Sequence, residues 1–187
     1  DGETTFVYDV DRSASAGSTF NKVAYFLALQ HRAGEVSYAF VAMDPFTNDI
    51  GKIGVPAKST GARFQQKVTG ALVKSNVPGV ASGSFPEGCN IEFWDCNYGG
   101  PNEANIPGAD DAFDFGDRMG PEKSPGYGSM QIHNWQEKHA IICFNRFGAG
   151  SSSDVGIGNS EGRTRDWTFT SSAAGIARAQ FLVLILP

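Results

Sequence analysis

Polar residues able to form hydrogen bonds alternate with apolar residues in two short segments of the chain. Residues 90 to 95 read Asn-Ile-Glu-Phe-Trp-Asp, and residues 129 to 134 read Ser-Met-Gln-Ile-His-Asn. If each segment is a β-strand, successive side chains point to opposite faces of a sheet. The apolar residues then enter the core, and Glu92, Gln131 and His133 are expected side by side in solvent on a common outer wall.

An indole beside carboxylate, amide and imidazole groups is typical of a sugar-binding site. The apolar face of a pyranose ring stacks on an aromatic ring, while its hydroxyls exchange hydrogen bonds with planar polar side chains. We therefore expect a carbohydrate ligand, although an ordinary exposed surface position is the alternative for each polar strand residue. The expected stacking residues are Trp94, Tyr98 and Tyr127. The expected polar contacts come from Glu92, Gln131, His133, Asn134 and Asn145, with Arg118 or Arg146 meeting any acidic substituent.

An enzyme is the alternative class of function. The triplet Gln131-Ile132-His133 resembles one on a jelly-roll strand of alginate lyases, in which a His neutralises or deprotonates the uronate and a Tyr protonates the leaving group. Tyr127 would take the second role. The Arg-x-Glu-Leu-type and Tyr-Phe-Lys-Ala-Gly strands of that family are not found in this sequence. A two-carboxylate hydrolase also stays open, because the separation of two carboxylates cannot be read from sequence.

One long Gly- and Pro-rich segment, from residue 97 to 128, concentrates acidic residues. Its carboxylates include Asp110, Asp114 and Asp117. Carboxylates and backbone carbonyls in a loop can converge on an oxygen-loving cation, so Ca²⁺ is a candidate ligand although EF-hand spacing is absent. The alternative for each of these residues is a turn or a solvated carboxylate.

Short runs of β-branched and aromatic residues, separated by Gly, Pro, Asn and Ser, predict an all-β protein. At this length they indicate a single domain over residues 1–187, folded as a two-sheet antiparallel β-sandwich or jelly roll. A single helical turn at 172–176 is also compatible with the sequence, and residues 148–162 are expected to form a wide surface turn. The expected strands are Thr4–Val10, Lys22–Gln30, Val36–Met43, Phe64–Ser75, Ile91–Trp94, Ser129–Trp135, His139–Phe147, Arg165–Thr170 and Ala177–Leu186.

Charge and hydropathy argue against nucleic acid and membranes as partners. The 187 residues are 41% hydrophobic and carry a formal charge of -5, which disfavours binding to nucleic acid. No apolar run approaches the roughly 20 residues that a membrane span needs. The chain opens at Asp1 without an initiator Met or a leader, so we expect a processed chain or a piece of a longer one.

The three cysteines have no zinc-site spacing, because neither a Cys-x-x-Cys nor a His-x-x-x-His pair accompanies them. If residues 90–94 form a strand, Cys89 and Cys96 are too far apart to bridge. Any disulfide would then involve Cys143, and three free thiols are the alternative.

Several strings, taken together, carry a resemblance to a known kind of domain. They are Ile91-Glu92-Phe93-Trp94 with Asn97-Tyr98, Phe113-Asp114-Phe115-Gly116-Asp117, the run from Gly126 to Asn134, Gly156-Ile157-Gly158-Asn159 and Asp166-Trp167-Thr168-Phe169. They resemble a β-sandwich accessory domain of large secreted polysaccharide-processing proteins from planctomycete-type and related bacteria, in chains labelled sialate O-acetylesterase or sulfatase.

The resemblance implies a secreted, non-catalytic carbohydrate-binding module. We expect it to tether an attached catalytic domain to a polysaccharide, with an acidic or sulfated marine glycan as one candidate. Such tethering raises the local concentration of substrate at the attached enzyme. A ligand-free structural spacer is a third reading. It predicts exposed hydrophobic patches that face a neighbouring domain.

Overall fold

The computed structural model of the protein describes residues 19–55, 63–94, 129–136, 139–146, 153–158 and 176–186. These residues form ten strands and one short 3-10 helix. In chain order the elements are β1 (Lys22–His31), β2 (Val36–Met43), η1 (Ile50–Lys52), β3 (Arg63–Val68), β4 (Ala71–Ser75), β5 (Gly83–Phe85), β6 (Cys89–Trp94), β7 (Ser129–Asn134), β8 (His139–Arg146), β9 (Ser153–Ile157) and β10 (Ile176–Leu186).

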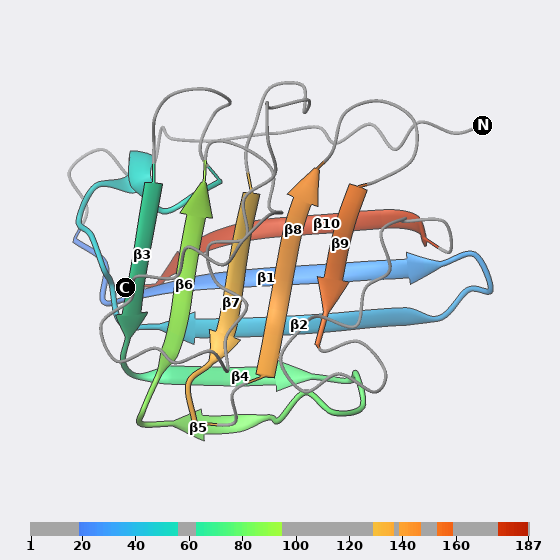
Figure 1. The fold of residues 1–187 in the computed structure, drawn as a ribbon, viewed down its shortest axis with the longest axis horizontal. Coiled ribbons are helices and arrows are strands. Elements are labelled where there is room, and N and C mark those ends of the chain that lie inside the picture. The colour runs from blue at the N-terminus through green and yellow to red at the C-terminus, as the bar shows by residue number, and fades with distance from the viewer. Residues whose placement is uncertain are drawn as a thin grey trace, which may run out of the picture.

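The strands form two antiparallel sheets of five strands each. The first sheet has the order β10-β1-β2-β4-β5, and the second sheet has the order β3-β6-β7-β8-β9. The strands of one sheet run crosswise to those of the other, as Figure 1 shows. This arrangement is an orthogonal packing of two sheets, and it confirms the predicted all-β, two-sheet sandwich.

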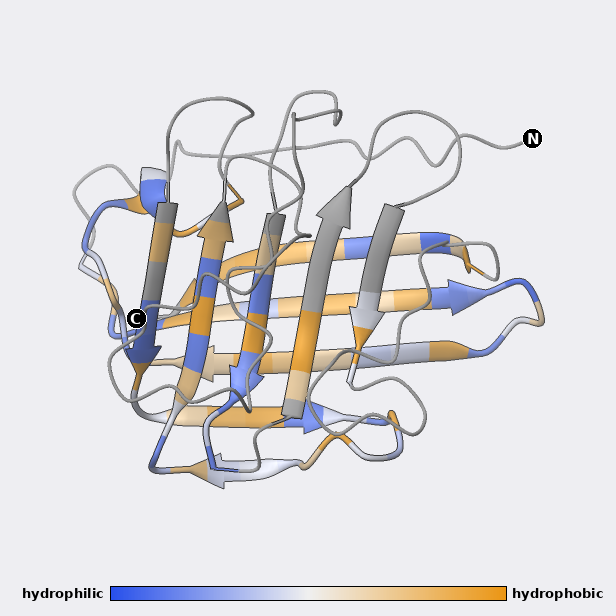
Figure 2. Cartoon of the chain, in the orientation of Figure 1, coloured by the Kyte–Doolittle hydropathy of each residue, from blue (hydrophilic) through white to orange (hydrophobic). Residues whose placement is uncertain are grey.

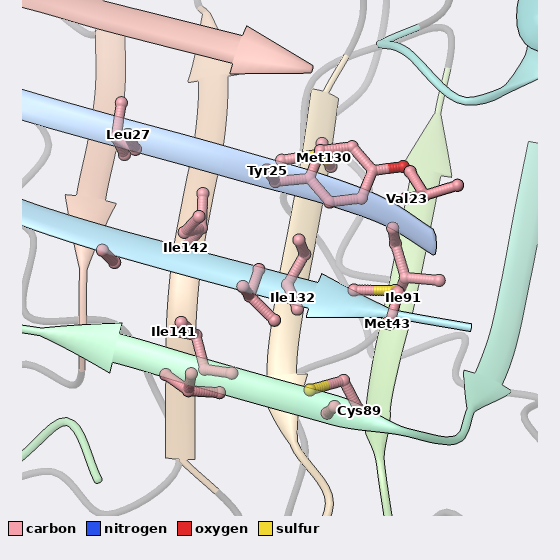
Figure 3. Close-up of a cluster of buried hydrophobic side chains, with 14 of the residues drawn as sticks. Val23, Tyr25, Leu27, Met43, Cys89, Ile91, Met130, Ile132, Ile141 and Ile142 are labelled. Atoms are coloured by element: carbon pink, nitrogen blue, oxygen red, sulfur yellow. The ribbon is translucent and has the colours of Figure 1, made fainter. Parts of the chain in front are cut away.

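The hydrophobic core lies between the sheets and is built by alternation along each strand. On β1 the odd-numbered residues from Val23 to Leu29 are buried, and they belong to one core cluster with Ile91, Met130 and Ile132 of the second sheet. Figure 3 shows Val23 and Tyr25 close to Met130 and Ile91. Tyr25 is fully buried, and its hydroxyl donates a hydrogen bond to the carbonyl oxygen of Ile53 at 2.7 Å. The hydroxyl therefore keeps a hydrogen-bond partner although it is buried. Burial raises the pKa of Tyr25 well above the usual value.

The sequence prediction of one continuous strand over Phe64–Ser75 is wrong. Gly70 adopts a left-handed conformation (φ 66°), and the chain passes there from β3 in the second sheet to β4 in the first. A side chain at residue 70 would also clash, because its Cβ would lie 2.5 Å from a carboxylate oxygen of Asp44. That carboxylate accepts hydrogen bonds from Lys22 and Thr69, at 2.5 and 2.8 Å, so the corner is linked to the end of β2 and the start of β1. The hydrogen bond from Lys22 is the main reason that the pKa of Asp44 is lowered.

Other predicted strands appear with small changes at their ends, and two strands were missed. β5 and β9 were not predicted, and β9 lies inside the segment interpreted as a wide surface turn. The predicted strands at 4–10 and 165–170, and residues 172–175 of the helical turn, lie outside the described residues. Residue 176 begins β10 instead of ending a helical turn.

Candidate functional site

Two pairs of polar side chains lie side by side on β6 and β7. Glu92 is directly opposite Gln131 in the antiparallel register, and Asn90 is directly opposite His133. The residues between them are core residues, so these four side chains project from the face of the second sheet that points away from the first. Figure 2 shows the matching hydrophilic and hydrophobic bands along β6. We call Asn90, Glu92, Gln131 and His133 the polar cluster.

The polar cluster is buried, which the sequence did not predict. All four side chains have 0% exposure, whereas Glu92, Gln131 and His133 were expected in solvent. Their adjacency was predicted correctly, but the exposure was not. The alternation of polar and apolar residues identifies the face that a side chain occupies and does not tell whether that face is covered.

Two members of the polar cluster have unmet hydrogen-bonding capacity. The carboxamide nitrogen and oxygen of both Asn90 and Gln131 are buried without a hydrogen-bond partner among the described residues. A buried polar group without a partner costs about 1–3 kcal/mol of folding free energy. Four such atoms on two adjacent strands therefore lower the stability of the folded protein.

The polar cluster combines a carboxyl group with a neutral imidazole. Complete burial lowers the pKa of His133 to about 3, so the ring is uncharged at neutral pH. The nearest described cation by register is Lys67, which lies opposite Asn90 on β3. Its ammonium group is occupied elsewhere, 3.3 Å from the Glu87 carboxylate and 4.0 Å from the centre of the Trp135 ring. The cluster thus offers carboxamide, carboxyl and uncharged imidazole groups, all of which can form hydrogen bonds.

Asn134 was predicted to act with His133, but it lies on the other face of the sheet. It is opposite Cys89 in the register of β6 and β7, and Cys89 is a core residue. Both residues are buried, and the Cys89 thiol is free. A disulfide between Cys89 and Cys143, left open by the sequence, is therefore not formed. Burial raises the pKa of Cys89 to about 12, so the thiol is protonated and unreactive in the folded protein.

The remaining predicted site residues are placed only in part. Trp94 ends β6 opposite Ser129 in register, and Asn145 and Arg146 lie near the end of β8 opposite β9. The other predicted ligand-binding and metal-binding residues lie outside the described residues; these are Tyr98, Arg118, Tyr127, Asp110, Asp114 and Asp117.

Within the described ranges, no group of three or more His, Cys, Asp or Glu side chains is placed to hold a metal ion. The predicted calcium site depends on aspartates beyond those ranges and stays a prediction. No helix in the described part of the chain is long and apolar enough to cross a membrane.

Sequence reasoning missed a second surface, on the outer face of the first sheet. Leu72, Leu182 and Leu184 are each 37–38% exposed there. A groove of about 390 Å³ lies on the same face, and its lining includes Phe40, Ala42, Leu72, Ser84 and Pro86. The signal was present in β1, where apolar residues occupy both alternating positions from Val23 to Leu29. Such a run predicts that both faces of the strand are apolar.

Comparisons of the chain with protein-family models, with curated proteins and with solved structures find no match.

Proposed function

We propose that the protein is a non-catalytic module that binds a polysaccharide, with the polar cluster on β6 and β7 as its hydrogen-bonding site. The observation that supports the proposal is the pair of carboxamides of Asn90 and Gln131. They are fully buried on one face, next to Glu92 and His133, and have no hydrogen-bond partner in the described part of the chain.

The energetics favour a role in binding over a purely structural one. Apolar side chains of similar size would fill the same positions without leaving polar atoms unsatisfied. A sugar hydroxyl both donates and accepts hydrogen bonds, so a row of hydroxyls satisfies the oxygen and the nitrogen of a carboxamide together. Binding would thus recover free energy that the empty site loses.

The charges of the cluster favour a neutral sugar. Glu92 supplies a carboxyl group, the imidazole of His133 is uncharged, and the ammonium of Lys67 is engaged by Glu87 and Trp135. Because all four side chains are buried, a ligand reaches them only after the structure opens locally over this face. Association that requires such a change is slower than ordinary docking.

Affinity electrophoresis in gels that contain neutral polysaccharides tests this proposal. The wild-type protein is expected to migrate more slowly in at least one of a panel of neutral plant and algal polysaccharides. Gln131→Leu and Asn90→Ala are expected to restore free migration. Gln66→Leu, which changes an exposed carboxamide on the neighbouring strand β3, is the matched control and leaves the retardation unchanged.

Two results would count against the proposal. Either no polysaccharide in the panel retards the wild-type protein, or the Gln131→Leu protein is retarded as strongly as wild type. Circular dichroism and thermal melting of each variant establish that any loss of retardation occurs in a folded protein.

A ligand-free spacer is the second candidate, and the exposed leucines on the first sheet favour it. Leu72, Leu182 and Leu184 form the kind of apolar surface that packs against a neighbouring domain. This candidate predicts that neither neutral nor anionic polysaccharides retard the protein.

A further inference from the structure

The outer face of the first sheet carries three aromatic rings on adjacent strands. Phe26 on β1 is directly opposite Phe40 on β2, and the Tyr38 ring centre lies 6.3 Å from that of Phe26. All three side chains are partly exposed, although their sequence neighbours Tyr25, Ala39 and Val41 are core residues. We call Phe26, Tyr38 and Phe40 the aromatic strip.

A cation stands on each side of the aromatic strip. Lys74 on β4 is directly opposite Phe40, and Arg178 on β10 is directly opposite Gln30 of β1. Both cations are exposed, and neither forms an ion pair with another described residue. Strand spacing and rise place their Cα atoms roughly 20 Å apart. The strip lies on β1 and β2, the two strands between the ones that carry the cations.

The first sheet has no carboxylate of its own to balance these cations. None of its five strands contains Asp or Glu, although the chain as a whole has a formal charge of -5. Lys22 is the third Lys or Arg residue of these five strands, and it is already paired with Asp44 at 2.5 Å. Lys74 and Arg178 therefore create a local positive potential on the surface of an acidic protein, and a positive potential attracts anions.

The face that carries the aromatic strip also has a groove, which Phe40 helps to line. Its volume of about 390 Å³ falls within the range of small-ligand sites, and Ser84 adds a hydroxyl to an otherwise mostly apolar lining. The register places Ala42 directly opposite Leu72, and both residues line the groove.

We propose that the aromatic strip, with Lys74 and Arg178, is a second glycan-binding surface and that it takes an anionic polysaccharide, one bearing carboxylate or sulfate groups. The proposal rests on the proposed function only for the class of ligand. Sugar rings stack on the strip, and the anionic substituents pair with the cation on either side. A second copy of this chain is a poorer occupant, because its first sheet would bring cations and no carboxylates to this face.

The test uses the Gln131→Leu protein, in which the polar cluster is disabled, in gels containing polygalacturonate, carrageenan or neutral hydroxyethyl cellulose. Retardation is expected in at least one anionic gel and not in the neutral gel, and it weakens as salt is added. Lys74→Gln and Arg178→Gln are each expected to weaken binding about 2- to 5-fold, as for an exposed ion pair. Phe40→Ala is also expected to weaken it.

Lys52→Gln is the control, because it removes one exposed positive charge from η1, which is not part of the first sheet, and should have little effect. Lys52 is paired with Asp49 at 3.6 Å, but the variant changes the net charge as much as Lys74→Gln does. The proposal is overturned if neither anionic gel retards the Gln131→Leu protein, or if Lys52→Gln weakens binding as much as Lys74→Gln. It is also overturned if light scattering shows a dimer that Phe40→Ala converts to monomer, because the strip is then an interface between copies. Wild-type retardation in neutral gels depends on the polar cluster alone, so the two proposals fail independently.

Discussion

Gln131 lies directly opposite Glu92 on neighbouring strands, and both side chains are completely buried on the face of the second sheet that points away from the core. Carboxylate and carboxamide groups are rarely buried unless they are fully hydrogen-bonded. The carboxamide of Gln131 has no partner within the described residues. This cost makes the polar cluster the part of the fold that most needs a functional explanation.

Replacing Gln131 with leucine should stabilise the folded protein while it abolishes binding. Removing a buried carboxamide that has no partner in the described part recovers its desolvation penalty, so we expect the free energy of unfolding to rise by about 1 kcal/mol. Urea denaturation of wild type and variant measures the difference. Gln66→Leu, which changes an exposed carboxamide on β3, should give no comparable gain. A marked loss of stability in Gln131→Leu would show that the carboxamide is satisfied in the folded state.

Acid should destabilise the protein through His133. Burial lowers its folded-state pKa to about 3, whereas the ordinary value is 6.5, so between these values the unfolded state binds a proton that the folded state does not. Stability therefore falls as pH drops below about 6.5. At pH 5 the contribution is on the order of 2 kcal/mol. His133→Gln should remove this part of the loss between pH 7.5 and 5, and urea titrations at both values measure it. His31→Gln, at a partly exposed position, serves as the control, and equal losses in both variants would contradict the assignment.

Gly88→Ala should be far more destabilising than Gly79→Ala. Both residues have a positive φ, 85° and 86°, so the backbone strain of the two substitutions is similar. A Cβ at residue 88 would lie 1.9 Å from the carbonyl oxygen of Val68, whereas nothing lies within 4 Å of a Cβ at residue 79. We expect about 1 kcal/mol for Gly79→Ala and at least about 3 kcal/mol, or failure to fold, for Gly88→Ala. Thermal melting compares them, and equal costs would contradict the close approach of β6 to the end of β3.

Cys89 should resist thiol reagents until the protein unfolds. The thiol is buried in the core, and burial raises its pKa to about 12, so almost no thiolate is present at pH 8. Alkylation with iodoacetamide followed by peptide mapping should show an unmodified Cys89 in the native protein and a modified one in guanidinium. Labelling in the native state, or a disulfide-linked peptide that contains Cys89, would contradict this placement.

The fold was predictable where each strand has a single clear pattern. Lys22–Gln30 and Val36–Met43 were predicted within one residue of β1 and β2, because both are mainly apolar runs that include β-branched and aromatic residues. The corner at Gly70 was missed because apolar residues continue on both sides of it. β9 was missed because Ser and Gly predict a turn, and pairing with β8 overrides that local preference.

The candidate site was predictable in its grouping and not in its environment. Residue parity placed Glu92, Gln131 and His133 on one face, and the register confirms that Glu92 and Gln131 are direct neighbours. Their burial depends on parts of the structure distant in sequence, which parity does not report. The aromatic strip was not predicted, although alternation puts Phe26 and Phe40 on the face opposite to the core residues Tyr25 and Val41.

The side-chain amide signals of Asn90 and Gln131 give the most direct test of carbohydrate binding at the polar cluster. In ¹⁵N-labelled protein these signals are assigned by their loss in Asn90→Ala and Gln131→Leu, and an oligosaccharide is added from whichever neutral polysaccharide retards the protein. We predict that both signals shift on binding. The signals of Gln66, which lies on the other face of the second sheet, and of Asn76, which follows β4 of the first sheet, should stay in place. Saturating oligosaccharide that leaves the Asn90 and Gln131 signals unmoved would contradict the account.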